Sequence, residues 1–205
     1  MVKLKDKIRE TAKRLFTEKG YDAVSLRAVA EEAGTTIGNL TYHYRQKEDL
    51  IAAIQKDSQA NFIIGLEGIP DQPRDVLRHL CLMAERTQAG HAENPFYFRN
   101  IIEMCANFPS IRENTVSFRK KIYNAYLECF DKLRGGGVMR TDIPVTNYNN
   151  LAYMMVILAT LWTQNASPHD DDNLPHSSLA ESILALVYPY LTPEGVALLR
   201  EVRGL

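Results

Sequence analysis

The sequence predicts an all-α protein with an N-terminal three-helix domain over residues 1–46 and a larger helical domain over residues 47–205. Three observations support this fold class. Apolar residues recur at steps of three and four along most of the chain, which is the spacing of one helix face. No stretch shows the alternation of apolar and polar residues that is typical of a strand. Glycine or proline interrupts the periodic segments where helices are expected to end.

Residues 1–20 are expected to form the first helix, and their surface is basic. They hold seven lysine and arginine residues and three acidic ones, on a chain whose formal net charge is −1. A locally basic start suits a protein that contacts phosphate groups with one end only. The same charges also fit a helix whose surface is simply solvated, and both interpretations stay open.

A short second helix and a turn follow. Ser25 is suited to be the N-cap of an amphipathic helix that ends at Gly34. Thr35 and Thr36 can cap a third helix that begins almost at once. Two helices joined by so short a turn are typical of the helix-turn-helix motif, although ordinary helical hairpins share the pattern.

The expected third helix has two different faces. Ile37, Leu40 and Tyr44 recur at steps of three and four and predict an inward stripe. The other face carries hydrogen-bonding groups and rings in place of the alternating charges of a solvated surface. A helix-turn-helix lays such a face of its second helix in the DNA major groove. The outward residues are Gly38, Asn39, Tyr42 and His43.

Beyond residue 46 the apolar periodicity predicts six further helices. Pro95 suits the first turn of one of them, Pro109 ends that helix, and the triple glycine at 135–137 ends the next. The predicted ranges are 47–64, 75–89, 95–107, 110–133, 147–165 and 177–191.

The predicted helix over 147–165 is apolar nearly all the way round. A helix of this kind needs cover on several sides, which a dimer supplies more readily than a monomer of 205 residues. The alternative is that this helix and the one over 177–191 form only the core of a single chain.

The segment from residue 8 to residue 50 resembles the DNA-binding domain of the tetracycline-repressor (TetR) family. The family pattern is an apolar first helix ending in Leu-Phe-x-x-x-Gly-Tyr, an Ala-rich second helix, a glycine, a short recognition helix and an aromatic-Lys-acidic close. The matching residues here are Leu15, Phe16, Gly20, Tyr21, Ala30, Ala33, Gly34, Gly38, Leu40, His43, Tyr44, Lys47, Glu48 and Leu50.

This resemblance implies a sequence-specific DNA-binding transcriptional regulator, a repressor that binds a palindromic operator as a homodimer and is released by a small-molecule ligand. A two-fold dimer places two recognition helices in successive major grooves. By resemblance, the last two predicted helices correspond to the pair that joins TetR-family subunits. The alternative is an all-helical small-molecule-binding protein, or an adaptor without a DNA-directed function. Catalytic motifs such as HExxH, GxSxG and the P-loop do not occur in the sequence, so no enzyme is predicted.

Four residues are candidates for base contacts. Arg27 matches a position that contacts guanine in some TetR-family members, and its guanidinium suits that base edge. An ion pair with Glu31 is the alternative for Arg27. We expect Thr36, Ile37 and Asn39 to face the bases. An asparagine can pair with adenine, and an isoleucine that turns outward can touch a thymine methyl group.

Three residues are expected to hold phosphate, which positions a protein without selecting a sequence; they are Tyr42, His43 and Lys47. The chain departs from the family pattern here. It has Thr41 where many members have tyrosine, with Tyr42 one place later, and it has Tyr44 where phenylalanine is usual. One residue on a helix is a rotation of about 100°, so Tyr42 need not make the contact of the usual tyrosine.

The resemblance also implies a pocket for a small-molecule effector among the helices after Lys47. His79 and Arg86 lie seven residues apart on one predicted helix and therefore on one face. If they are buried, they need an anionic or polar partner that a ligand could supply. Aromatic and methionine side chains at this spacing are often ordinary core. The candidate pocket residues are His79, Met83, Arg86, Phe98, Asn107, Tyr123, Tyr126 and Trp162.

No cofactor, metal or membrane association is predicted. The chain has three cysteines without a CxxC spacing, which indicates reduced thiols in a cytoplasmic protein, with a redox sensor as the alternative. The first twenty residues are charged, unlike a signal segment, and the longest apolar run, 151–162, is shorter than the roughly 20 residues that cross a bilayer. The loop from His169 to His176 holds three aspartates that could bind a divalent ion, but such loops are usually solvated.

Overall fold

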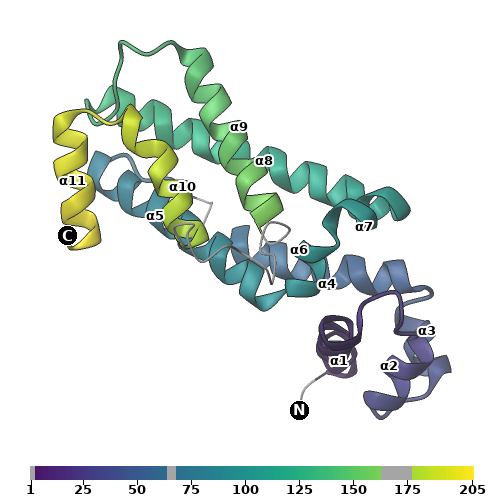
Figure 1. Ribbon diagram of the computed structural model, residues 1–205. Coiled ribbons are helices and arrows are strands. Elements are labelled where there is room, and N and C mark those ends of the chain that lie inside the picture. Colours follow the sequence, from purple (N-terminus) through teal and green to yellow (C-terminus); the bar gives the residue numbers. More distant parts are fainter. Residues whose placement is uncertain (1–2, 64–67, 163–176) are drawn as a thin grey trace. The chain divides into compact units, whose positions relative to one another are not determined.

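The computed structural model describes residues 3–63, 68–162 and 177–205, and these are almost entirely helical (Figure 1). Within these ranges there is no strand, and one isolated bridge pairs Met139 with Leu191. The all-α prediction is confirmed. The helices are α1 (Leu4–Lys19), α2 (Leu26–Glu32), α3 (Ile37–His43), α4 (Lys47–Ile63), α5 (Pro73–Glu93), α6 (Pro95–Arg99), α7 (Ile101–Asn107), α8 (Pro109–Gly135), α9 (Val145–Leu161), α10 (Leu179–Val187) and α11 (Pro193–Arg203), with a 3-10 turn over Tyr188–Tyr190.

The chain packs as two compact units. The first contains Met1–Ala60 and Glu93–Ser117, and the second contains Asn61–Ala92 and Phe118–Leu205. Helices α4 and α8, and α5 through its last residue Glu93, therefore contribute residues to both units. The domain boundary expected between residues 46 and 47 stays a prediction.

The first unit surrounds a core to which α1, α2, α3, α4 and α6–α8 contribute. The ring centroids of Phe16 in α1 and Phe96 in α6 lie 5.4 Å apart. The α4 side chain of Glu48 accepts a hydrogen bond from the backbone N–H of Ser110, at 3.1 Å, in the first turn of α8. The three N-terminal helices therefore share one core with α6, α7 and the start of α8. The buried members are Ile8, Ala12, Leu15, Phe16, Tyr21, Val24, Val29, Ala30, Ala33, Leu40, Tyr44, Leu50, Ile51, Ile54, Phe96, Met104 and Ile111.

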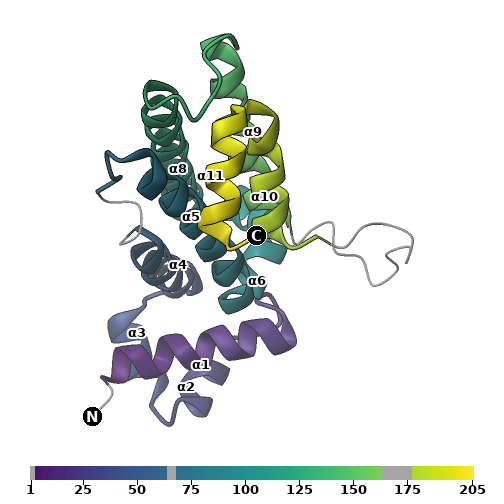
Figure 2. The ribbon, with the colours of Figure 1, turned by 90° about the vertical axis from the view of Figure 1, so that its left-hand side faces the viewer.

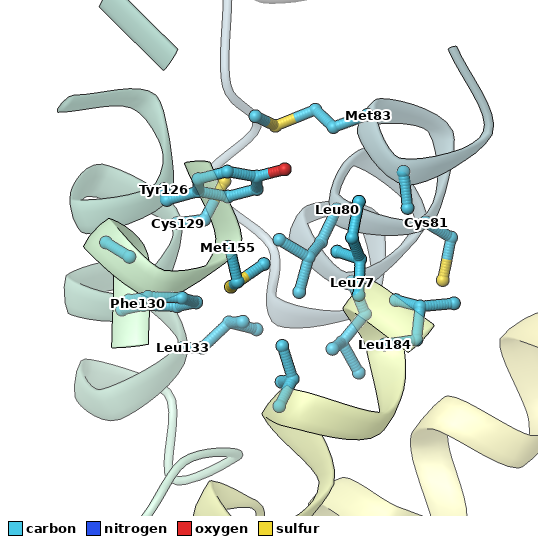
Figure 3. Close-up of a cluster of buried hydrophobic side chains, with 14 of the residues drawn as sticks. Leu77, Leu80, Cys81, Met83, Tyr126, Cys129, Phe130, Leu133, Met155 and Leu184 are labelled. Atoms are coloured by element: carbon cyan, nitrogen blue, oxygen red, sulfur yellow. The ribbon is translucent and has the colours of Figure 1, made fainter. Parts of the chain in front are cut away.

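The second unit has its own core, built from α5, α8, α9 and α10 (Figure 3), to which α11 adds Leu199. Helices α9 and α10 pack against each other (Figure 2). The labelled side chains in Figure 3 come from α5 (Leu77, Leu80, Cys81, Met83), α8 (Tyr126, Cys129, Phe130, Leu133), α9 (Met155) and α10 (Leu184). Cys81 and Cys129 are free thiols in this core, and burial raises the pKa of Cys129 to about 12. That these cysteines are reduced in the cell stays a prediction.

The helix predicted over 95–107 is two helices. Asn100 leaves helical geometry, with φ −116° and ψ 14°, and separates α6 from α7. Its side-chain Nδ2 donates a hydrogen bond to the carbonyl oxygen of Phe96, at 2.7 Å. Asparagine favours such local side-chain bonds to the backbone over a continuous helix, which explains the break.

Helix α11 was not predicted, although its end signals are present in the sequence. Thr192 caps it by accepting a hydrogen bond from the backbone N–H of Gly195, at 3.0 Å, and Pro193 occupies the first turn. Gly204 ends the helix with φ +71°. A Cβ on Gly195 would lie 2.1 Å from the carbonyl oxygen of Val138, so this close approach requires glycine.

Other predicted ends moved by a few residues. Helix α5 is longer than the predicted 75–89, and α10 is shorter than 177–191 because the 3-10 turn replaces its last turn. Residues 163–165, and the acidic loop from His169 to His176, lie outside the described residues. Where the structure describes the chain, no helix is long and apolar enough to cross a membrane.

Candidate nucleic-acid interface

The turn between α2 and α3 is fixed by local chemistry. The Ser25 hydroxyl accepts a hydrogen bond from the backbone N–H of Ala28, at 3.1 Å, and begins α2 as predicted. Gly34 takes φ +67°, a conformation that favours glycine. The Thr36 hydroxyl accepts from the backbone N–H of Asn39, at 3.2 Å, and begins α3. The expected helix-turn-helix arrangement is therefore present.

The inward stripe of α3 is shorter than predicted. Leu40 and Tyr44 are buried, but the side chain of Ile37 is 37% exposed. Ile37 is the first residue of the helix, and helical Cα–Cβ bonds tilt toward the N-terminus, so its side chain points past the end of the packed stripe. The prediction of an inward Ile37 was wrong, and its side chain is available for contact with another molecule.

Tyr42 is the most exposed large hydrophobic side chain of the motif, with 83% of its surface accessible. The hydroxyl of the preceding Thr41 is turned back and donates to the carbonyl oxygen of Ile37, at 2.9 Å. The half-buried ring of His43 lies edge-on to the Tyr42 ring, with centroids 5.2 Å apart. The ring that faces outward is therefore that of Tyr42.

The polar side chains at the start of α3 keep unused hydrogen-bonding groups. Asn39 donates one amide N–H to the Thr35 hydroxyl, at 3.1 Å. Its second amide N–H and its carbonyl oxygen are the pair that an adenine edge needs. The Thr36 oxygen is used by the helix cap, but its own hydroxyl hydrogen can still be donated.

Arg27 is exposed on the first turn of α2. Its guanidinium forms no ion pair with the residues that the structure describes, and the alternative pairing with Glu31 is not seen. The charge is thus free for a base or a phosphate.

Lys47 makes contacts that the sequence did not indicate. Its Nζ donates to the carbonyl oxygens of Tyr21, at 2.8 Å, and Asp22, at 3.2 Å, in the loop after α1. A lysine ammonium has three N–H groups, so one remains for a phosphate. Lys47 therefore joins α4 to the loop after α1, and this role does not depend on a contact with DNA.

The basic surface of α1 is only partly available. Arg9 and Arg14 are held in ion pairs with acidic side chains. Lys7 is exposed, and its Nζ is 3.5 Å from the position that a Cβ on Gly34 would take, which places it beside the turn. Arg45 is exposed directly after α3. Lys7 and Arg45 are additional candidates for phosphate contacts, and their only sequence signal was the positive charge.

The candidate pocket residues divide between the two units. Phe98 and the exposed Asn107 belong to the first unit. The other six belong to the second, so the structure does not place all eight in one compact unit. Met83 and Tyr126 are fully buried in its core, Tyr123 and Trp162 pack against that core, and His79 and Arg86 are half-buried on α5.

Two of the candidate pocket residues, His79 and Tyr126, carry a buried polar atom. Nε2 of His79 is buried without a hydrogen-bond partner among the residues described. The Tyr126 hydroxyl, which points toward the α5 side in Figure 3, faces the side chain of Thr87 in α5. Burial raises the pKa of Tyr126 and lowers that of His79. The buried Nε2 of His79 needs a partner, which a polar ligand could supply.

Comparison with known proteins identifies the family. Residues 8–54 match the family model described as bacterial regulatory proteins, tetR family. Residues 76–199, more than half of the chain, match the TetR model described as bacterial transcriptional repressor. The chain belongs to the TetR family.

Several curated TetR-family relatives are similar in sequence. The HTH-type transcriptional repressor AcnR of Corynebacterium diphtheriae is 28% identical over 174 residues, covering 83% of this chain and 85% of that protein. The HTH-type transcriptional regulator QacR of Staphylococcus aureus is 41% identical over 51 residues, covering 25% of this chain and 27% of that protein. The relatives named here are transcriptional regulators.

Solved TetR-family structures share the fold. A regulator from Marinobacter aquaeolei has a TM-score of 0.81 at 24% identity, covering 98% of this chain and 99% of that one. A regulator from Haloarcula marismortui has a TM-score of 0.72 at 16% identity, covering 92% and 98%. The family match, together with the exposed face of α3, makes this protein a DNA-binding transcriptional regulator.

Proposed function

We propose that this TetR-family protein is a repressor that binds a palindromic operator as a homodimer and leaves it when a small molecule binds. The observation that carries the proposal is the surface of α3. Its buried side is anchored by Leu40 and Tyr44, while Thr36, Asn39 and Tyr42 stay exposed. A short helix fixed on one side and polar on the other suits insertion into a major groove.

The proposed contacts fall into two classes. Arg27, Thr36, Ile37 and Asn39 contact base edges, where each good bidentate pair contributes about 1–3 kcal/mol of discrimination. The second class holds phosphate and fixes the orientation of the protein on the duplex. It consists of Tyr42, His43 and Lys47. Lys7 and Arg45 are included as well, because both are positively charged and exposed.

The proposed dimer uses the exposed apolar residues of the second unit. On α9, Tyr153 is 58% exposed and Met154 is 54% exposed, although the neighbouring Met155 is fully buried. Tyr188, directly after α10, is also exposed. Large apolar side chains gathered on one pair of helices suit an interface with a second copy.

We place the effector site in the second unit, near Tyr126 and His79. The unpartnered Nε2 of His79 supports a ligand with a hydrogen-bonding group. We propose no cofactor, no metal and no catalytic activity. A cytoplasmic location stays a prediction.

Binding to labelled duplexes tests the proposal against the alternative of a carrier or adaptor. The full chain is titrated against a pool of random duplexes in a fluorescence-anisotropy assay at low and at moderate salt. A DNA-binding regulator binds the pool at low salt and loses affinity steeply as salt rises. Absence of binding to the pool at low salt would support the carrier or adaptor.

A further inference from the structure

We propose that Arg9 is a positioning residue for DNA binding, whose guanidinium holds the end of α3 against α4 and thereby sets the orientation of the recognition helix. This inference rests on the proposed function of α3. It concerns one group of side chains, the Arg9 cluster, which consists of Arg9, Asp6, Tyr44 and Asp57.

The Arg9 guanidinium binds three partners. Its Nη2 lies 2.6 Å from a carboxylate oxygen of Asp6, one turn earlier in α1. Its Nε lies 2.5 Å from a carboxylate oxygen of Asp57 in α4. Its Nη1 donates a hydrogen bond to the hydroxyl of Tyr44, at 3.1 Å. One planar group therefore connects α1, the end of α3 and α4, all within the first unit.

Tyr44 transmits this link to α3. It is the residue that ends the helix, and its backbone N–H donates to the carbonyl oxygen of Leu40, at 2.9 Å. Its ring is buried in the core of the first unit. A hydrogen bond to the Tyr44 hydroxyl consequently restrains the last turn of the recognition helix.

The surroundings of Arg9 do not suit a phosphate contact. Two carboxylates neutralise the guanidinium and leave the group of three charges net negative. The side chain of Arg9 is only 21% exposed. Arginine also differs from lysine in holding several partners at fixed angles, because its donors form a rigid planar fork. These features favour a role in geometry over a role in binding the DNA backbone.

The test compares Tyr44→Phe, which removes one hydroxyl, and Arg9→Lys, which keeps the charge but loses the fork. Lys120→Met, which changes an exposed lysine of α8 in the second unit, is the control and should leave operator affinity unchanged. Affinity for a selected operator is measured at several salt concentrations. We expect Tyr44→Phe and Arg9→Lys each to weaken operator binding about tenfold with an unchanged salt slope, and the double variant to be no weaker than Arg9→Lys alone. An Arg9→Lys variant that weakens every duplex alike, or a Tyr44→Phe variant with wild-type operator affinity, would overturn the proposal.

A second measurement does not depend on DNA. Amide hydrogen exchange of residues 40–44 is followed in the free protein, in wild type and in Tyr44→Phe. We expect exchange about tenfold faster in the variant, with unchanged rates in α5 as the internal reference. Equal rates at residues 40–44 would show that the Arg9 cluster does not hold α3. Faster exchange in a protein that binds no duplex would show that the Arg9 cluster restrains α3, but it would remove both the proposed function and a role of Arg9 in DNA binding.

Discussion

The ammonium group of Lys47 donates a hydrogen bond to the carbonyl oxygen of Tyr21, across 2.8 Å. Lys47 begins α4, and Tyr21 lies in the loop that follows α1. The bond therefore connects the two ends of the segment that contains the helix-turn-helix. A residue that the sequence indicated as a phosphate contact is also part of the framework that holds the motif.

Lys47→Met should lower the free energy of unfolding by about 1–2 kcal/mol, because two backbone carbonyls lose a charged donor. If the third N–H reaches phosphate, the variant should also reduce the salt slope of DNA binding by about one. Urea unfolding and a salt titration measure the two effects separately. Lys19→Met, at the exposed end of α1, is the control, and equal unfolding curves for the two variants would contradict the framework role.

Arg27→Ala should reduce operator affinity by about 1–3 kcal/mol and relax the base preference at one position of each half-site. Its guanidinium is exposed and has no acidic partner in the described part of the chain, so the folded protein should be equally stable. Glu31→Ala tests the alternative of an ion pair. Binding assays with single-base operator variants show whether Arg27 contacts a base. An unaltered base preference in Arg27→Ala argues against such a contact.

Tyr42→Phe should weaken binding to all duplexes by about 0.5–1.5 kcal/mol, as expected for loss of one hydrogen bond to a phosphate. The residue is 83% exposed, so thermal unfolding should not change. Thr41→Ala serves as the neighbour control, since the Thr41 hydroxyl bonds within its own helix. A loss confined to one operator sequence would mean that Tyr42 contacts a base.

Met154→Glu should convert the dimer to a monomer in sedimentation equilibrium, because a charge would replace an apolar side chain at the proposed interface. Leu82→Glu, which changes a partly exposed leucine of α5 in the same way, is the matched control and should leave the dimer intact. A Met154→Glu protein that still sediments as a dimer would place the interface elsewhere.

The stability of the fold should decrease as the pH falls below about 6.5. Burial lowers the pKa of His79, and the positive charges of Arg86 and Lys132 lower this pKa further. The negative charge of Glu128 raises it, but the net shift is downward. The unfolded chain therefore takes up a proton at a higher pH than the folded chain does. His79→Gln should reduce the loss of unfolding free energy between pH 8 and pH 5, and an identical loss would contradict this. His91, whose pKa is also lowered by burial, should account for part of what remains.

The parts of the motif that the sequence predicted depend on neighbouring residues. Ser25 and Thr36 cap helices through bonds to residues three positions away, and Gly34 supplies a conformation that its neighbours do not favour. Such preferences act within one turn of chain. They are visible in sequence spacing without knowledge of the tertiary fold.

Two contacts that the sequence did not predict join residues far apart in the chain. Arg9 meets Tyr44 across 35 residues, and Lys47 meets Tyr21 across 26. In the sequence, the positive charges of Arg9 and Lys47 look the same as that of the exposed Lys7. Only the packing of the helices shows that Arg9 and Lys47 bind other parts of the chain. The break at Asn100 depended on a choice between a helical bond and a side-chain bond, which periodicity does not reveal.

Selection of bound sequences from a pool of random duplexes, with the wild-type chain of 205 residues, tests the central claim most directly. The structure and the proposed dimer predict an inverted repeat whose two half-sites lie about one helical turn, or a multiple of it, apart. Recovery of no enriched motif, or of a single motif without two-fold symmetry, would contradict the proposal that two copies of α3 bind one operator.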